Sequence, residues 1–202
     1  MNLYLVRHGE TQANADGVYC GVSDLALTQR GQWQAHRLAW QLADISFDRI
    51  LTSRLRRSRE TAQILRPQAA MEAWPQLDEM DFGQWELRHH RDLKHQDVER
   101  YAAWCADWQH TIPPDGEGFQ AFSHRVVAAT NRLRQWDGVD NTLLVAHQGV
   151  LGIILATLLG LPPAAMWHFT FQQDAFTQVS LNDGFCVLKQ ANDSGRVLLS
   201  GY

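Results

Sequence analysis

The sequence predicts an α/β fold in which helices cover both faces of a mainly parallel sheet. The order of patterns along the chain is β-α-β-α, then a long helical excursion, then β-α. The two clearest strands, 3–6 and 141–146, are almost continuously apolar, which is typical of strands buried on both faces. Alternating segments near the C-terminus add an antiparallel pair. We therefore expect a three-layer α/β/α sandwich with a mainly parallel central sheet and an antiparallel edge pair.

The individual elements follow from apolar periodicity and from capping residues. Thr28 can cap one helix and Ser53 another, and residues 14–26 are polar enough to predict a loop. The alternation of 176–181 and 185–188 around Asn182-Asp183-Gly184 predicts a hairpin. Strands are also expected over 48–52, 70–74 and 167–171, and helices from Thr28 to about 42, from Ser53 through 65, and over 97–108, 117–136 and 150–159.

Length and composition bound the class of protein. A chain of 202 residues suits a single domain over 1–202, with about 85–122 as a substrate-side insertion or lid. A net charge of -4 predicts no general attraction to nucleic acid or to an anionic membrane. The longest apolar run, 150–159, is too short to span a bilayer, and nothing resembles a signal peptide. The oligomeric state is left open.

Cysteine and histidine usage point to a cytoplasmic protein without a metal. The three cysteines, Cys20, Cys105 and Cys186, are odd in number and form no CxxC pair, which indicates reduced thiols. The nine histidines show no metal-ligand spacing. We therefore expect no metal and no organic cofactor.

Two of the predicted strands end in the same kind of residue. One is followed by Arg7-His8-Gly9 and the other by His147-Gln148-Gly149. If the strands are neighbours, both imidazoles project into one crevice at the carboxyl edge of the sheet. Arg7 disfavours protonation of His8, and each glycine lets backbone amides approach a bound group. With arginine forks nearby, phosphate is the ligand that this crevice suits best.

This chemistry predicts transfer of a phosphoryl group to a histidine. A neutral imidazole can attack phosphorus while cations hold the equatorial oxygens. Four arginines begin the predicted second helix, where cations are unfavourable, so at least one is expected to face an anion: Arg54, Arg56, Arg57 and Arg59. The leaving oxygen needs a carboxylic acid with a raised pKa, which the loop from Asp78 to Glu86 can supply.

Motifs in the same order along the chain resemble the histidine phosphatase superfamily, with its phosphoglycerate mutase branch. They are Arg7-His8-Gly9-Glu10-Thr11-x-x-Asn14, Leu27-Thr28-x-x-Gly31-x-x-Gln34-Ala35, Thr52-Ser53-x-Leu55-x-Arg57-x-x-x-Thr61-Ala62, Leu77-x-Glu79-x-x-Phe82-Gly83-x-Trp85-Glu86 and Val145-Ala146-His147-x-Gly149. The resemblance implies a phosphohistidine mechanism. It assigns His8 as nucleophile, Glu79 as acid and base, and Arg7, Asn14, Arg57 and His147 as phosphate holders.

Further stretches look like superfamily members that remove the 5′-phosphate of α-ribazole 5′-phosphate, or of adenosylcobalamin 5′-phosphate, in cobalamin nucleotide-loop assembly. These stretches are 82–93, 103–110, 116–122 and 165–169. The alternatives are a phosphoglycerate mutase or a broad small-molecule phosphatase of the same superfamily, and more remotely an inactive phosphate-binding module. The family often has glycines where this chain has Leu87 and Gln148.

Additional contacts to phosphate or substrate are expected from Gly21, Gln148, Gly149 and Trp85, the last by stacking on an aromatic leaving group. Most tryptophans are simply core, so the alternative for Trp85 is packing. His89, His90 and Arg91 either touch the leaving group or form a solvated lid, and these two possibilities stay open.

Overall fold

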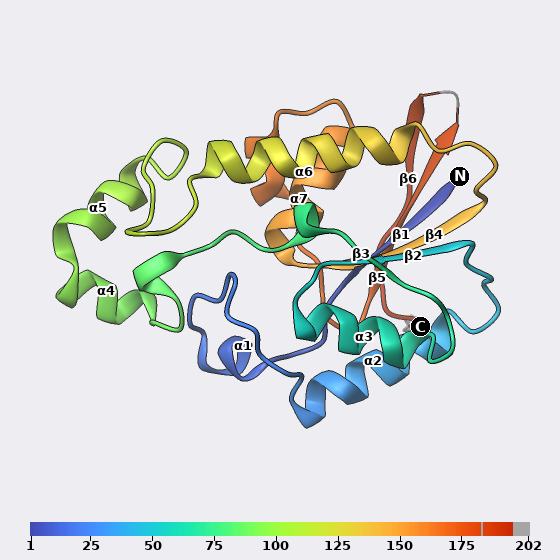
Figure 1. The fold of residues 1–202 in the computed structure, drawn as a ribbon, viewed down its shortest axis with the longest axis horizontal. Helices are drawn as coiled ribbons and strands as arrows, with labels where there is room; N and C mark the ends of the chain where they lie inside the picture. The colour runs from blue at the N-terminus through green and yellow to red at the C-terminus, as the bar shows by residue number, and fades with distance from the viewer. Residues whose placement is uncertain (183, 196–202) are drawn as a thin grey trace, which may run out of the picture.

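A six-stranded sheet forms the centre of the fold (Figure 1). The computed structural model describes residues 1–182 and 184–195, and the structural statements below concern those residues. The strand order is β3-β2-β4-β1-β5-β6. In chain order the strands are β1 (Asn2–Arg7), β2 (Arg49–Thr52), β3 (Glu72–Ala73), β4 (Asn141–Ala146), β5 (Phe176–Asn182) and β6 (Phe185–Asp193).

The pairing confirms the predicted sheet. β4 lies between β1 and β2 and runs parallel to both, with Asn2 opposite Asn141 and Arg49 opposite Thr142. β3 is parallel to β2. β5 is antiparallel to β1, and β6 is antiparallel to β5. The mainly parallel sheet thus has an antiparallel pair at one edge. Of the expected hairpin turn, Asp183 lies outside the described residues.

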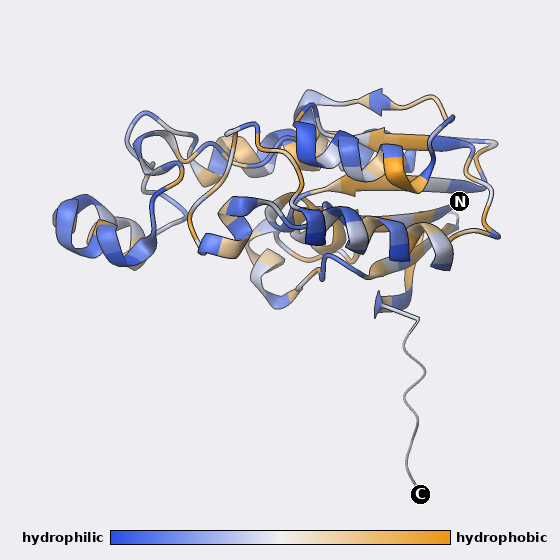
Figure 2. Cartoon of the chain, turned by 90° about the horizontal axis from the view of Figure 1, so that it is seen from below, coloured by the Kyte–Doolittle hydropathy of each residue, from blue (hydrophilic) through white to orange (hydrophobic). Residues whose placement is uncertain are grey.

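Helices cover both faces of this sheet, with α2 and α3 on one side and α6 and α7 on the other (Figures 1 and 2). The α-helices are α1 (Gln12–Asp16), α2 (Gln29–Gln41), α3 (Arg56–Leu65), α4 (His90–Gln96), α5 (Val98–Ala106), α6 (Phe119–Arg134) and α7 (Gln148–Leu158). Short 3₁₀ helices are η1 (Pro75–Leu77), η2 (Gly83–Trp85) and η3 (Pro163–His168). None of the helices described here is both long and apolar enough to cross a membrane.

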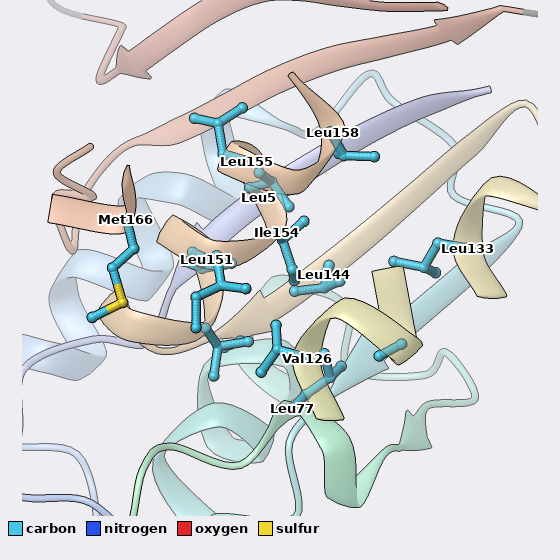
Figure 3. Close-up of a cluster of buried hydrophobic side chains, with 14 of the residues drawn as sticks. Leu5, Leu77, Val126, Leu133, Leu144, Leu151, Ile154, Leu155, Leu158 and Met166 are labelled. Carbon is cyan, nitrogen blue, oxygen red and sulfur yellow. The ribbon is translucent and has the colours of Figure 1, made fainter. Parts of the chain in front are cut away.

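The alternation of side chains along β1 explains the two cores. Leu3 and Leu5 point to the face covered by α6 and α7, whereas Tyr4 and Val6 point to the face covered by α2 and α3. Figure 3 shows the first of these cores, in which α7 packs its leucines and isoleucines on Leu5 and Leu144. Each fully buried leucine stabilises the fold by about 1.5–3 kcal/mol relative to an exposed one.

Four of the predicted helices, α2, α5, α6 and α7, form within two residues of their expected ends, because apolar stripes and caps determine them. The hydroxyl of Thr28 accepts a hydrogen bond from Gly31 N at 3.0 Å, as predicted for the cap of α2. Helices α6 and α7 occupy 119–134 and 148–158 where 117–136 and 150–159 were expected.

Other predictions were wrong in detail. Residues 12–16 form α1, within a segment expected to be largely loop, because Thr11 and Asn14 cap each other reciprocally. Ser53 does not cap α3, which begins at Arg56 after Leu55. The strand expected over 70–74 is reduced to Glu72–Ala73, and that over 167–171 is replaced by η3 and irregular chain.

The long excursion between η2 and α6 contains α4 as well as α5. Figure 1 shows these two helices beyond the end of the sheet. A small cluster of Trp85, Leu93 and Tyr101 anchors them to the chain that leaves η2. The excursion thus carries its own packing contacts, in addition to those that join it to the larger core.

Candidate active site

The carboxyl ends of β1, β4 and β2 bring four polar side chains together. Arg7 ends β1 and His8 follows it, His147 follows β4, and Ser53 follows β2. Because these strands are adjacent and parallel, their ends meet at one edge of the sheet. The ring centroids of His8 and His147 are 5.0 Å apart. The structure therefore places both predicted histidines in one site.

His8 is held in the form that a nucleophile requires. Its Nδ1 lies 2.7 Å from the carbonyl oxygen of Gly9, which can only accept, so Nδ1 carries the proton of the neutral ring. Nε2 then keeps its lone pair. Burial, followed by the charges of Arg57 and Arg7, lowers the pKa of His8 well below its ordinary value. The ring is neutral at neutral pH.

Gly9 has to be a glycine, because the chain passes close to α2 at this point. A Cβ at position 9 would lie 2.4 Å from the carbonyl oxygen of Gly31. The loop that presents His8 is also held by Gly9 N, which donates to the Thr61 hydroxyl at 3.0 Å.

Glu10 orients the same loop. Its carboxylate accepts a hydrogen bond from the Thr28 hydroxyl and forms an ion pair with Arg30.

His147 is also buried and engages both of its ring nitrogens. Arg57 donates from Nε to Nδ1 at 3.3 Å, and Nε2 lies 2.8 Å from the Ser53 hydroxyl. Because the arginine can only donate, the neutral ring carries its proton on Nε2. Burial, then Arg57, His8 and Arg7, lowers its pKa well below the ordinary value.

Of the four arginines near the start of α3, only Arg57 enters the site. Its side chain is 1% exposed, and it donates to the carbonyl oxygens of Gly21 at 2.6 Å and Ser23 at 2.8 Å. Arg54 pairs with Asp78 and Arg56 pairs with Glu60, while Arg59 is exposed.

A carboxylate fixes the loop that holds Arg57. Glu86 accepts from the backbone amides of Gly21, Val22 and Ser23, from the Ser23 hydroxyl and from Phe82 N. Gly21 must be a glycine, since a Cβ there would lie 1.8 Å from the Met80 carbonyl oxygen. Gly21 therefore acts by holding Arg57 through its backbone, and it does not line the adjacent cavity.

Arg7 and Asn14 face the same site from the other side. Arg7 donates from Nη1 to the Phe171 carbonyl oxygen at 3.2 Å, whereas its Nε is buried with no hydrogen-bond partner in the described structure. A buried unpaired donor of this kind is suited to an incoming anion. The Asn14 Oδ1 accepts from Thr11 and from Gln173, which leaves its NH₂ group to donate to a ligand.

Glu79 supplies the carboxyl group. Its two oxygens accept from the backbone amides of Met80 at 3.1 Å and Gly149 at 3.1 Å, so the first turn of α7 helps to fix it. Desolvation raises its pKa, while these hydrogen bonds and the charges of Arg57 and Arg125 partly oppose the rise. Arg125 also donates to the backbone carbonyls of Asp78 and Glu79, which positions the loop.

A chamber of about 250 Å³ opens beside these groups. Arg7, Asn14, Glu79, Gln148 and Gly149 line its polar end. The rest of its wall is aromatic or apolar. The rings come from the loop after α1, the residue before η2, the excursion, α6 and η3: Tyr19, Phe82, Trp104, Trp108, Phe119, Phe122 and Trp167.

The structure corrects the expectation for Trp85. Its ring is fully buried beside Leu93 and Tyr101, and its Nε1 donates to Asp97 at 2.8 Å. It does not line the chamber, so it has no free face for a substrate. The aromatic wall comes from other tryptophans instead. In the sequence, the sign of this wall is the high density of aromatic residues within 104–122 and at Trp167. That density does not show which of the rings face the chamber.

Ser53, Phe171 and Gln173 also belong to the site, and the sequence interpretation missed all three. Their roles arise from contacts between distant segments, so no local pattern marks them. His89 caps α4 by accepting from Arg91 N, and neither it nor His90 nor Arg91 lines the chamber. Within 1–182 and 184–195, no three His, Cys, Asp or Glu side chains are grouped so as to hold a metal.

A buried neutral imidazole, two arginines, a second histidine and a protonatable carboxyl group define a protein that transfers phosphoryl groups through histidine. Residues 3–194 match the histidine phosphatase superfamily (branch 1), and the chain belongs to this superfamily.

Relatives and solved structures agree with this assignment over nearly the whole chain. The chain is 48% identical over 194 residues to an adenosylcobalamin/alpha-ribazole phosphatase of Escherichia coli K12, covering 95% of this chain and 96% of that protein. It is 47% identical over 197 residues to the corresponding Salmonella typhimurium phosphatase, with the same two coverages. The crystal structure of the alpha-ribazole phosphatase from Shigella flexneri superposes with a TM-score of 0.93 at 47% identity, covering 96% of this chain and 97% of that one.

Proposed function

We propose that this protein hydrolyses a phosphomonoester in two steps, with His8 as the nucleophile. In the first step Nε2 of His8 attacks phosphorus in line, and the P–O bond to the leaving group breaks. Glu79 protonates the departing oxygen. The observation that carries this proposal is the His8–Gly9 hydrogen bond, which keeps the proton on Nδ1 and directs the lone pair of a buried ring to Nε2.

The second step reverses the role of the carboxyl group. The Glu79 carboxylate removes a proton from water, the water oxygen attacks phosphorus, and the P–N bond breaks to release phosphate and neutral His8. Arg7, Arg57 and Asn14 hold the phosphoryl oxygens through both steps, so their charges and dipoles are already oriented when the transition state forms. His147 joins them when its Nε2–H exchanges the Ser53 hydroxyl for a phosphoryl oxygen.

The substrate that we propose is α-ribazole 5′-phosphate, free or within adenosylcobalamin 5′-phosphate. The aromatic chamber supports it, because a benzimidazole base is flat, apolar and able to stack on tryptophan. A chamber of about 250 Å³ holds one such group and leaves an attached corrin ring outside. The names of the two bacterial relatives point to the same substrate.

A phosphoglycerate mutase is less well supported. Its substrate carries a carboxylate in addition to the phosphate, and that group calls for a second cation. Among the described residues that line the chamber, Arg7 is the single arginine or lysine, and it faces the phosphate end. The aromatic wall offers no ionic partner for a carboxylate.

The same proposal includes a cytoplasmic location, a single domain over 1–202 and a small-molecule partner. Three free cysteines support a reducing compartment. The contact of Tyr19 with Tyr101, a hydrogen bond of 2.9 Å between their hydroxyls, ties the 85–122 insertion to the chamber, which supports a substrate-side lid.

The test is kcat/KM over α-ribazole 5′-phosphate, 3-phosphoglycerate, fructose 2,6-bisphosphate and a simple nucleotide. We expect a preference of about a hundredfold for the ribazole ester, equivalent to about 2.7 kcal/mol of extra leaving-group binding. A flat profile would reduce the assignment to a phosphatase of broad specificity. Net isomerisation of 3-phosphoglycerate to 2-phosphoglycerate would favour the mutase.

A further inference from the structure

Residues 169–173 form an irregular segment that borders the phosphate end of the site. The segment follows η3 and precedes β5, so no sheet or helix ladder fixes its backbone. It nevertheless supplies two of the contacts described above. The Phe171 carbonyl oxygen accepts from Arg7, and the Gln173 side chain donates to Asn14 at 2.8 Å. We call residues 169–173 the strap.

Gln148 holds the strap from the side of α7. Its Nε2 donates to the Phe169 carbonyl oxygen at 2.8 Å, and its Oε1 accepts from Phe171 N at 2.9 Å. Both ends of the amide are therefore used, and each faces the complementary backbone group. An amide so engaged has little left to offer a substrate, although the residue lines the chamber.

Asn192 holds the strap from the side of β6. Its Nδ2 donates to the Thr170 carbonyl oxygen at 2.8 Å, and its Oδ1 accepts from Gln172 N at 2.8 Å. Hydrogen bonds from two amide side chains thus hold the strap, whose backbone has no ladder of its own. The Phe171 peptide is the central point, because its N–H binds Gln148 while its carbonyl oxygen binds Arg7.

We infer that Gln148 is a positioning residue, which sets the Arg7 guanidinium for phosphate by fixing the Phe171 peptide. The inference rests on the proposed role of Arg7 as a phosphate holder. Arg7 needs such support, since its Nε is buried without a partner and its Nη1 has the Phe171 carbonyl oxygen as its protein acceptor. Once Phe171 is free to move, the guanidinium loses its orientation and part of its preorganisation.

The experiment replaces Gln148 by Met, which keeps the length and bulk of the side chain but removes both hydrogen bonds. The readouts are the inhibition constants of inorganic phosphate and orthovanadate, and kcat/KM with p-nitrophenyl phosphate. These probes contain the phosphoryl group without a ribazole base. The result is therefore independent of whether α-ribazole phosphate is the natural substrate.

We expect both inhibition constants to rise about five- to tenfold in the Gln148→Met variant, with kcat/KM falling by a similar factor. The decisive readout is Gln148→Met in an Arg7→Ala background. If Gln148 acts through Arg7, it has no further effect there on phosphate affinity. If Gln148→Met raised the inhibition constants by the same factor in the wild-type and Arg7→Ala backgrounds, the inference would be overturned and the loss assigned to general packing. Unchanged phosphate and vanadate constants would also overturn it.

Asn192→Gly is the second variant, and it keeps the test informative if Gln148→Met fails to fold. Asn192 has φ of 51°, which glycine adopts without strain, so this change removes the two strap contacts and little else. We expect weaker phosphate binding in the same direction, again absent in the Arg7→Ala background. A leaving-group role for Gln148 would instead lower kcat/KM for a ribazole ester while leaving the phosphate constant unchanged, which contradicts the inference.

Discussion

Arg57 donates from Nε to Nδ1 of His147 at 3.3 Å, so the arginine sets the tautomer of the second histidine as well as the charge of the site. The two remaining arms of its fork bind the carbonyl oxygens of Gly21 and Ser23. One planar group thus links α3, the loop after α1 and the end of β4. A lysine has one nitrogen and cannot reproduce these three directions.

The Arg57→Lys variant should therefore lose about 10- to 150-fold in kcat/KM, the range for a lost charge-assisted contact of about 1.5–3 kcal/mol. Steady-state kinetics measures this loss, and the imidazole ¹⁵N shifts of His147 report its tautomer. Arg59→Lys, on the exposed side of the same helix, is the matched control and should behave as wild type. Equal activity of the two variants would contradict the role of Arg57.

The His8→Ala variant should lose turnover while keeping its fold. Without an imidazole there is no nitrogen to accept the phosphoryl group, and we expect kcat to fall by about a thousandfold or more. The measurement is rapid-quench labelling with a ³²P-labelled ester: wild type should accumulate an acid-labile, base-stable label that the variant lacks. Retained turnover in a folded variant would remove the proposed mechanism.

Glu79→Gln should affect poor leaving groups most. An alkoxide needs a proton when it departs, whereas p-nitrophenolate leaves without one. We expect the chemical step to slow by about 10²–10⁴-fold for an alkyl phosphate and much less for p-nitrophenyl phosphate. Single-turnover measurement of leaving-group release gives this comparison, because release accompanies formation of the phosphohistidine intermediate. Equal losses for both esters would count against an acid role.

The pH dependence follows from two opposite shifts. The pKa of His8 lies well below its ordinary 6.5 because burial and two arginines disfavour the cation, so His8 is neutral and reactive in mildly acidic solution. The pKa of Glu79 lies above its ordinary 4.5 because burial disfavours the carboxylate. The first step needs neutral His8 and protonated Glu79. As the pH increases, kcat/KM should therefore rise through the pKa of His8 and fall through the pKa of Glu79.

The corresponding measurement is kcat/KM for an alkyl phosphomonoester from acidic to alkaline pH. The acid limb should lie below pH 6.5, and the alkaline limb should be missing in Glu79→Gln. An acid limb centred above pH 7 would show that His8 is not the depressed group. An alkaline limb that persists in the variant would belong to another residue.

Substitutions at Trp85 and Trp167 should change different properties, the free energy of unfolding at Trp85 and KM at Trp167. Trp85→Phe removes the hydrogen bond to Asp97 and leaves a gap in a buried cluster, so the free energy of unfolding should fall by about 1–3 kcal/mol without a change in KM. Trp167, 58% exposed at the chamber, should behave in the opposite way. Trp167→Ala should raise KM for α-ribazole 5′-phosphate and leave stability unchanged. Denaturant unfolding and steady-state kinetics distinguish the two.

The parts of the fold that could be predicted are those determined by local pattern. β1 and β4 are continuous apolar runs, and parallel strands present their carboxyl ends at one edge, so the meeting of His8 and His147 followed from the sequence. The resemblance then singled out Arg57 among four arginines. Their spacing could not do so, because the pairing of Arg54 with Asp78 is a contact between distant residues.

The remaining features depend on tertiary contacts that leave no local mark. Ser53 has the chemistry of a helix cap, yet its hydroxyl contacts His147, which lies ninety-four positions further along the chain. The alternation of 167–171 is typical of a strand, but η3 and two amide side chains hold this part instead. Burial of Trp85 depends on helices α4 and α5 folding over it. Periodicity alone does not determine any of these arrangements.

Because β4 lies between β1 and β2, the site cannot assemble before residues 141–146 have been synthesised. His8 and Arg57 both precede β4 in the chain, yet β1 and β2 are not neighbours in the sheet and have no ladder of their own. They are joined only when residues 141–146 insert between them. At about 5–20 residues per second, the nascent chain waits several seconds for this strand. Until then His8 and Arg57 lack both His147 and the strand that brings them together.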